Sequence, residues 1–180
     1  MTQVQFVSRM VLACTIAKQK GATINTPAVI AQSALESGWG NSGLTRKANN
    51  LFGIKAPKGW TGETLKMLTY EWDRVKKKYY QVIATWCVYP SWNECIVHYS
   101  NVVRTRWWFK DALPYADDPV GNGDSIQWIA HLVDRDVEGE LAWATGPNYT
   151  AKVAHLGQEI ENLGRPKWGV EHVGTTDTVR

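Results

Sequence analysis

The spacing of hydrophobic residues near the start of the chain predicts an amphipathic helix. Apolar residues recur there at intervals of three and four: Phe6, Met10, Ala13 and Ala17. This spacing places them on one face of a helix that runs from about Val4 to Lys20 and is ended by Gly21. Because Arg9 interrupts the apolar stretch and no positive charge precedes it, we expect neither a signal peptide nor a membrane span here.

A second helix is predicted directly after the first. Thr26 is the expected N-cap and Pro27 the expected first helical residue, ahead of a run of apolar residues. Gly38 or Gly40 ends this helix, because glycine readily adopts the left-handed conformation found at helix ends. Glu36 is therefore expected in the last turn, beside apolar neighbours.

The pattern changes in the middle of the chain to runs rich in β-branched and aromatic residues. The segments ETLKMLTYEW (63–72) and KYYQVIATWCVY (78–89) are separated by charged residues, which predicts a β-hairpin. Further helices are expected from Ser91, which has Glu94 at capping-box spacing, from Ser125 to Val137 and from Asn148 to Asn162. This order predicts a single α+β, mainly α domain over residues 1–165, with a cleft between the helical part and the hairpin. Residues 166–180 are predicted to form a polar tail.

The composition favours a saccharide ligand over a nucleic acid. Ten of the 180 residues are tryptophan, whose large flat rings suit the apolar faces of sugars, although core packing is the alternative for each ring. The net charge is only +3, so we expect no nucleic-acid partner and at most a mild attraction to anionic polymers. We expect the chain to be a monomer.

The cysteine and histidine residues indicate neither a metal site nor a disulfide framework. Cys14, Cys87 and Cys95 are odd in number and lack a CxxC motif, so reduced thiols are expected, and a Cys87–Cys95 pair depends on geometry. His98 and His131 fall within predicted helices and are interpreted as structural residues. We therefore expect no metal and no cofactor.

Glu36 is the residue whose predicted position has the clearest chemical consequence. The negative end of a helix dipole and apolar neighbours both disfavour a carboxylate, and both raise its pKa. A glutamic acid that stays protonated near neutral pH can donate its proton to a leaving oxygen, as the general acid of a glycoside hydrolase does. The alternative is a solvated residue at a helix end.

The residues around Glu36 strongly resemble a known catalytic motif. AQSALESGWG (31–40), followed by NNLFGIKA (49–56), is similar to the core of glycoside hydrolase family 73, the β-N-acetylglucosaminidases that cut peptidoglycan. The resemblance extends over roughly residues 6–163 and implies a lysozyme-like helical domain with a small β-hairpin lobe beside a substrate cleft. It also implies that Glu36 is the general acid.

Two further catalytic residues are implied by the resemblance. LTYEW (68–72) resembles the strand of the family that carries a second acid, which corresponds to Glu71. This residue either activates water or orients the substrate acetamido group. Asp73 is a weaker candidate for that role, and a strand residue paired with a lysine such as Lys78 is the alternative for Glu71. LAWATGPNY (141–149) resembles the closing motif, whose tyrosine corresponds to Tyr149, and a packed aromatic residue is the alternative there.

Four residues are candidates for substrate binding. Asn50 and Phe52 belong to the second motif, where Asn50 is expected to hold the cleft backbone or touch substrate and Phe52 to line the floor. Trp86 and Trp143 are candidate sugar platforms, with core packing equally open. TWCVYPSWNECIVHY (85–99) resembles the family, but Trp86-Cys87 replaces the usual Phe-Arg and Gly146 replaces the usual Asp.

The resemblance implies a peptidoglycan hydrolase that cleaves the β-1,4 bond after N-acetylglucosamine without a cofactor. The alternatives are a muramidase or lytic transglycosylase of the same fold, and a non-catalytic peptidoglycan-binding or tail-structural module. Without a signal peptide, we expect synthesis in the host cytoplasm and action on the cell wall after release through a holin, in a virion or by a secretion apparatus. A phage endolysin is favoured over a secreted effector.

Overall fold

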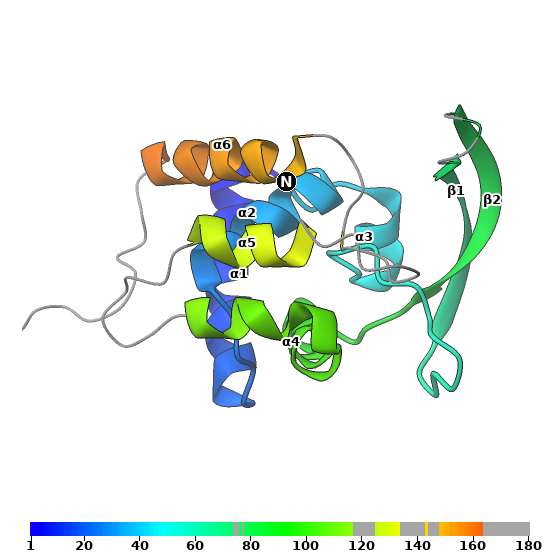
Figure 1. Cartoon of the computed structure of the whole chain (residues 1–180), viewed down its shortest axis with the longest axis horizontal. Helices are drawn as coiled ribbons and strands as arrows, with labels where there is room; N and C mark the ends of the chain where they lie inside the picture. The colour runs from blue at the N-terminus through cyan, green and yellow to red at the C-terminus, as the bar shows by residue number, and fades with distance from the viewer. Residues whose placement is uncertain (74–75, 77, 117–124, 134–142, 144–147, 164–180) are drawn as a thin grey trace, which may run out of the picture.

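The computed structural model describes residues 1–73, 76, 78–116, 125–133, 143 and 148–163. These residues form a mainly helical protein with a β-hairpin, which confirms the predicted fold class (Figure 1). The elements in chain order are α1 (Gln3–Gln19), α2 (Thr26–Ser37), α3 (Gly43–Ala48), β1 (Thr64–Asp73), β2 (Lys78–Cys87), α4 (Trp92–Thr105), the 3-10 helix η1 (Trp107–Tyr115), α5 (Ser125–Val133) and α6 (Tyr149–Asn162). None of the helices within the described ranges is long and apolar enough to cross a membrane.

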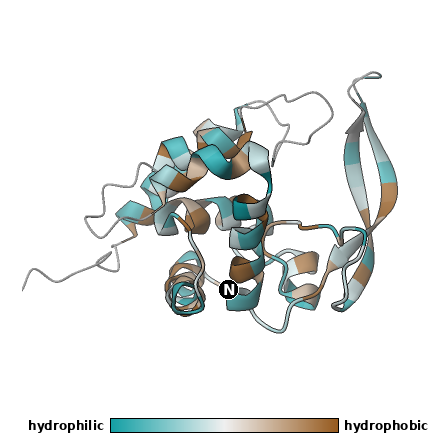
Figure 2. Ribbon diagram, turned by 60° about the horizontal axis from the view of Figure 1, so that its bottom comes forward, coloured by the Kyte–Doolittle hydropathy of each residue, from teal (hydrophilic) through white to brown (hydrophobic). Residues whose placement is uncertain are grey.

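The helix α2 is packed inside the helical part of the protein, where it contacts α1, α5 and α6. Most of its residues are buried, including the polar side chains of Gln32 and Ser33. The helices around it alternate hydrophobic and hydrophilic residues, as expected for amphipathic helices that cover a core (Figure 2). Packing on several sides fixes the direction of α2 and therefore the position of Glu36 at its end.

The start of α2 differs by one residue from the prediction. Asn25, rather than Thr26, is the N-cap, because its Oδ1 accepts a hydrogen bond from the backbone N–H of Ala28 at 3.0 Å. Asn and Thr are both good caps, so the sequence alone does not separate them. The predicted end is confirmed, since Gly38 is the C-cap in the left-handed conformation, with φ of 55°.

The hairpin pairs β1 with β2 in antiparallel register and has two different faces. Glu71 is opposite Tyr80, and Leu65 is opposite Trp86, so these residues share one face because side chains alternate along a strand. Met67 is also on that face, and its side chain lies 3.6 Å from where a Cβ on Gly43 of α3 would be. The face that carries Glu71 is therefore turned toward α3 and the helical part.

The other face of the hairpin is exposed. It carries large apolar side chains that are more than half exposed: Leu68, Tyr70, Tyr79 and Ile83. Figure 1 shows the hairpin (green) standing apart from the helices over much of its length. A two-stranded sheet with so little packed against it is stabilised mainly by its own pairing and by contacts at its base.

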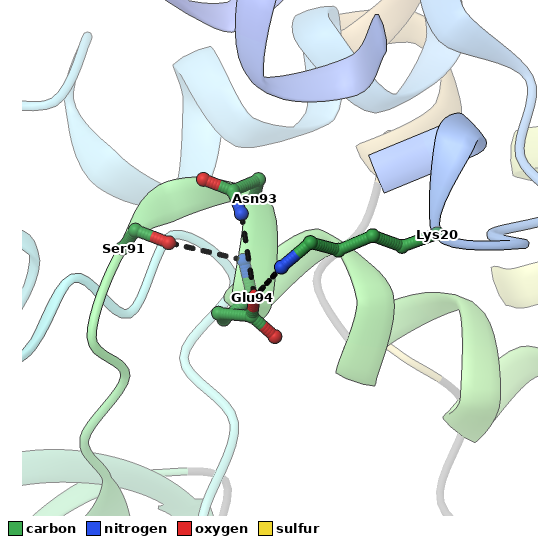
Figure 3. A network of polar contacts seen from close by, with 4 residues as sticks. All are labelled: Lys20, Ser91, Asn93 and Glu94. Atoms are coloured by element: carbon green, nitrogen blue, oxygen red, sulfur yellow. Dashed lines mark hydrogen bonds and ion pairs between the residues drawn. The ribbon is translucent and has the colours of Figure 1, made fainter. Parts of the chain in front are cut away.

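The beginning of α4 confirms a predicted cap but not the full capping box. Ser91 Oγ accepts the backbone N–H of Glu94 at 3.4 Å, as the spacing predicts. The Glu94 side chain is instead directed to Lys20, just beyond α1, and Asn93 donates to it (Figure 3). This ion pair joins α1 to α4, and such partly exposed pairs stabilise a fold only weakly.

Two elements were not predicted from the sequence, the short helix α3 and the 3-10 helix η1. Both are short, and η1 contains Pro114, so neither has the long apolar periodicity that predicts a helix. α5 confirms the predicted helix from Ser125, and residues 134–137 of that prediction lie outside the described residues. The predicted tail, 166–180, also lies outside them.

Candidate active site

Glu36 lies in the last turn of α2, where the chain turns sharply. Gly38 and Gly40 have positive φ angles of 55° and 73°. At Gly40 a Cβ would lie only 3.0 Å from Trp92 and 3.1 Å from Phe6, so only glycine fits. This turn ends the helix one residue after Glu36, at Ser37, and leaves the Glu36 side chain half-buried rather than enclosed in the core.

Tyr149 is the polar partner of Glu36. It is the first residue of α6, and its hydroxyl donates a hydrogen bond to Oε1 of Glu36 at 2.5 Å. The two residues are 113 positions apart in the chain and are brought together by the packing of α6 against α2. The structure thus unites the predicted general acid with the predicted tyrosine.

The environment of Glu36 favours its protonated form. Burial raises the pKa of this carboxyl above its ordinary value of 4.5, and the hydrogen bond from Tyr149 opposes that rise to a smaller extent. Burial also raises the pKa of the Tyr149 hydroxyl, and the neighbouring carboxylate raises it further, so Tyr149 stays a neutral donor. A half-buried, protonated carboxyl with a fixed donor on one oxygen is suited to general acid catalysis.

Phe52 and Trp143 lie in an aromatic cluster around Tyr99. The Phe52 ring stacks on Tyr99 with centroids 4.4 Å apart, and Trp143 meets the Tyr99 ring edge-on at 4.8 Å. Phe52 is only 3% exposed, whereas Trp143 is partly buried. Phe52 is therefore a buried support for the Tyr99 ring, and Trp143 keeps some exposed surface beside Tyr99.

Asn50 holds the backbone between α3 and the hairpin. Its side chain donates to the carbonyl oxygens of Ile54 and Cys87, both at 2.9 Å, and accepts the Ile54 N–H at 3.0 Å. The residue is 1% exposed. These bonds occupy the amide and favour the first of the two expected roles, holding the cleft backbone.

Replacing Asn50 with alanine should lower the free energy of unfolding by about 3 kcal/mol, because buried backbone groups lose their partners. Urea unfolding monitored by circular dichroism measures this loss. The matched control is Asn101→Ala on the exposed surface of α4, which should change stability by less than about 0.5 kcal/mol. Equal effects of the two substitutions would contradict an anchoring role for Asn50.

Glu71, Lys55 and Trp86 form a second group on the hairpin. Lys55 Nζ contacts Glu71 Oε1 at 2.5 Å and lies 5.8 Å from the centroid of the Trp86 ring. The lysine paired with Glu71 is thus Lys55, not the Lys78 considered from the sequence. Backbone pairing of Lys55 with Trp86 at the end of β2 places it there. Trp86 is 8% exposed, which supports its core interpretation over that of an open platform.

Sequence reasoning missed Gln32 and Lys55. Gln32 lies one helical turn before Glu36, and its Nε2 donates to the Tyr149 hydroxyl at 3.3 Å. A polar residue at the i−4 position of the candidate acid, inside an apolar stripe, was the available signal. Lys55 is inside the NNLFGIKA motif, but its ion pair with Glu71 depends on the hairpin register.

The remaining candidate groups have structural environments. Cys14, Cys87 and Cys95 are buried and none of them forms a disulfide, so the Cys87–Cys95 pair is not formed. His98 Nδ1 is 2.7 Å from the Tyr89 hydroxyl, and His131 stacks on the ring of Tyr115, which supports the structural interpretation of both. Among the described residues, no group of three or more His, Cys, Asp or Glu side chains is placed to hold a metal ion.

A pocket of about 850 Å³ lies away from these candidate residues. It is formed by the loop before β1, the chain after β2 and the first turns of α4, and its lining includes Trp60, Glu63, Tyr89 and His98. The Trp60 ring stacks on the His98 ring with centroids 4.9 Å apart, so one face of Trp60 is covered by His98. None of the predicted site residues lines this pocket.

Comparison with known proteins identifies relatives that span most of the described chain. The family model of glucosaminidases, described as mannosyl-glycoprotein endo-beta-N-acetylglucosaminidase, matches residues 13–162. The peptidoglycan hydrolase FlgJ of Pseudomonas aeruginosa is 28% identical over 74% of this chain and 31% of its own length. The exo-glucosaminidase LytG of Bacillus subtilis is 30% identical over 73% of this chain and 43% of its own length.

A solved structure agrees with these sequence matches. A mutant peptidoglycan hydrolase from Sphingomonas sp. A1 superposes with a TM-score of 0.68 and 25% identity, covering 87% of this chain and 92% of the other. The chain spans less than half the length of the two curated relatives, so it corresponds to one part of each.

Proposed function

Because the chain belongs to the glucosaminidase family, we propose that it is a peptidoglycan hydrolase that cleaves the β-1,4 bond after N-acetylglucosamine. The observation that carries the proposal is the pair formed by Glu36, whose pKa is raised by burial, and Tyr149, whose hydroxyl donates to it. Glu36 protonates the leaving oxygen as the glycosidic bond breaks. Tyr149 stabilises the carboxylate that results.

The hairpin supplies the second carboxylate. Glu71 is on the face turned toward α3, and 31% of its side chain is exposed, so it is accessible to a sugar bound between the hairpin and the helical part. There it either activates water or orients the acetamido group of the substrate. Trp143, which is only partly buried, contributes apolar surface for a sugar ring, whereas Phe52 and Trp86 are buried and support the site from within.

Replacing Glu71 with glutamine should lower kcat by at least about tenfold. A neutral amide cannot take a proton from water, and it does not stabilise the positive charge that develops on the substrate. The rate is measured as reducing ends released from glycan strands. A loss of about a hundredfold or more would assign Glu71 to the activation of water. Glu63→Gln, an exposed acid just before β1, is the control and should keep wild-type activity. An unchanged rate in Glu71→Gln would exclude the residue from the reaction.

Mass spectrometry of the muropeptides released by the purified protein tests the cleaved bond. We expect reducing ends on N-acetylglucosamine. Reducing ends on muramic acid would instead identify a muramidase, and anhydro products would identify a lytic transglycosylase. Binding to peptidoglycan without release of any muropeptide would identify a non-catalytic module.

Lysis of the cell wall by a phage endolysin stays a prediction. Its test is to express the chain in the cytoplasm of a Gram-negative host with and without a holin. Lysis only in the presence of the holin supports an endolysin. Lysis without the holin would contradict the expectation that the protein reaches the cell wall through a holin. The expected monomeric state is checked by light scattering on the same protein.

A further inference from the structure

A chain of hydrogen bonds leads from the core of the helical part to Glu36. Trp128 Nε1 on α5 donates to the hydroxyl of Tyr99 on α4 at 3.2 Å. That hydroxyl donates to Oε1 of Gln32 at 2.7 Å. Gln32 Nε2 donates to the hydroxyl of Tyr149 at 3.3 Å, which in turn donates to Glu36 Oε1 at 2.5 Å. The chain therefore joins four helices and ends on the candidate general acid.

The direction of this chain follows from its first member. An indole N–H can only donate, so Trp128 requires the Tyr99 oxygen to accept, and the single Tyr99 proton is then directed to Gln32. This fixes which end of the Gln32 amide is oxygen, an assignment that hydrogen-bond networks decide. In the reversed orientation the buried Tyr99 hydroxyl would have no acceptor, which is costly at 0% exposure.

We propose that Gln32, Tyr99 and Trp128 are positioning residues, which aim the Tyr149 hydroxyl at Oε1 of Glu36 so that the catalytic proton is carried by Oε2. Since Gln32 donates to Tyr149, the Tyr149 proton is directed onward to Glu36. An Oε1 that accepts this bond is the carbonyl oxygen of the protonated carboxyl. The acid proton then resides on Oε2 and is transferred from there to the glycosidic oxygen.

The opposite orientation of the Gln32 amide would prevent Glu36 from donating its proton to the leaving group. If the Gln32 amide were free to rotate, its oxygen would accept the Tyr149 proton, and Tyr149 would then accept the proton of Glu36. The acid would be hydrogen-bonded to the protein and not to the leaving group. This inference rests on the proposed role of Glu36 as general acid, and it concerns how that role is enforced.

Among the residues that the structure describes, the titratable groups that interact with Glu36 are the hydroxyls of Tyr149 and Tyr99, and burial raises the pKa of both. Burial and the Tyr149 bond, rather than a neighbouring charge, shift the pKa of Glu36. Because the Tyr149 bond lowers the pKa of Glu36, a reversal of that bond changes this pKa. The pH profile of the reaction therefore shows which way the bond points.

Tyr99→Phe tests the proposal, because it removes one hydroxyl and keeps the ring that stacks on Phe52. We expect kcat on soluble glycan strands to fall about tenfold with KM unchanged, as when a supporting residue behind an active group is lost. We also expect the alkaline limb of the pH profile to move to higher pH, because Glu36 loses the donor that stabilises its charged form. A merely structural role predicts the opposite shift, since loosened packing admits water.

Three further variants make the test specific. Tyr89→Phe removes a buried hydroxyl that contacts His98 instead, so it should leave kcat and the pH profile unchanged. Adding Tyr99→Phe to a Tyr149→Phe background should cause no further loss, because both act through one bond. Gln32→Met keeps the side-chain length and should reproduce the Tyr99→Phe result. It tests the same hydrogen-bond chain if the Tyr99→Phe protein does not fold.

The outcomes separate this proposal from the proposed function. An unchanged kcat and pH profile in Tyr99→Phe and Gln32→Met, with Glu36→Gln inactive, would overturn the positioning role alone. Full additivity of Tyr99→Phe and Tyr149→Phe would also overturn it. If Glu36→Gln kept its activity, the proposed role of Glu36 as general acid would be wrong.

Discussion

Replacing Glu36 with glutamine should reduce the release of reducing ends from peptidoglycan by about a thousandfold, within the range of about 10² to 10⁴ that general acid catalysis contributes. Glutamine has nearly the same shape and keeps an oxygen that accepts the Tyr149 bond, but it has no proton to donate. The measurement is a reducing-end assay at fixed glycan concentration. Glu161→Gln, on the exposed surface of α6, is the control and should keep full activity.

The same variant has an expected effect on stability, with a definite dependence on pH. Because the folded-state pKa of Glu36 is raised above 4.5, ionising this group at higher pH costs the folded state free energy. The contribution of Glu36 to the free energy of unfolding is therefore lost as pH rises from 4.5 through its folded-state pKa, and Glu36→Gln lacks this loss. Urea unfolding at pH 7 should find the variant more stable, with the difference vanishing below pH 4.5. If Glu36→Gln were less stable than wild type at pH 7, the raised pKa of Glu36 would be contradicted. If the variant stayed active, the catalytic role of Glu36 would be contradicted.

The helices and hairpin were predictable because their signals are local. Glu36 was placed correctly in the last turn of α2 from the apolar run before it and Gly38 after it. The hairpin followed from its β-branched and aromatic runs. The N-cap was misplaced by one residue, and η1 was missed, since neighbouring cap residues compete and short helices have no period to detect.

The partners within the site were predictable only where a family motif named them. The resemblance named Tyr149 as a functional residue, but its hydrogen bond to Glu36 and its link to Gln32 depend on how α6 packs on α2. The pairing of Glu71 with Lys55 was also missed, because it is set by the register of the hairpin and not by distance along the chain. Contacts between distant segments are decided by tertiary packing, which local patterns do not encode.

Replacing Tyr149 with phenylalanine should lower kcat by about 10- to 100-fold, since a hydrogen bond to a charged group contributes about 1.5–3 kcal/mol. Tyr149 donates to Glu36 Oε1, and this bond stabilises the carboxylate that forms as the proton leaves. Without it, burial alone acts on Glu36 and its pKa rises further. The acid then holds its proton more tightly and delivers it less readily.

The pH profile of Tyr149→Phe distinguishes this explanation from simple disruption. Activity falls at high pH when Glu36 loses its proton, so a higher pKa should move the alkaline limb to higher pH even as the maximal rate falls. Measuring kcat from pH 4 to 9 on soluble glycan strands checks both effects. Tyr115→Phe, at a tyrosine that stacks on His131, is the matched control and should change neither. An alkaline limb that moves to lower pH would show that water has entered beside Glu36, and would contradict a role for Tyr149 as the donor that tunes the acid.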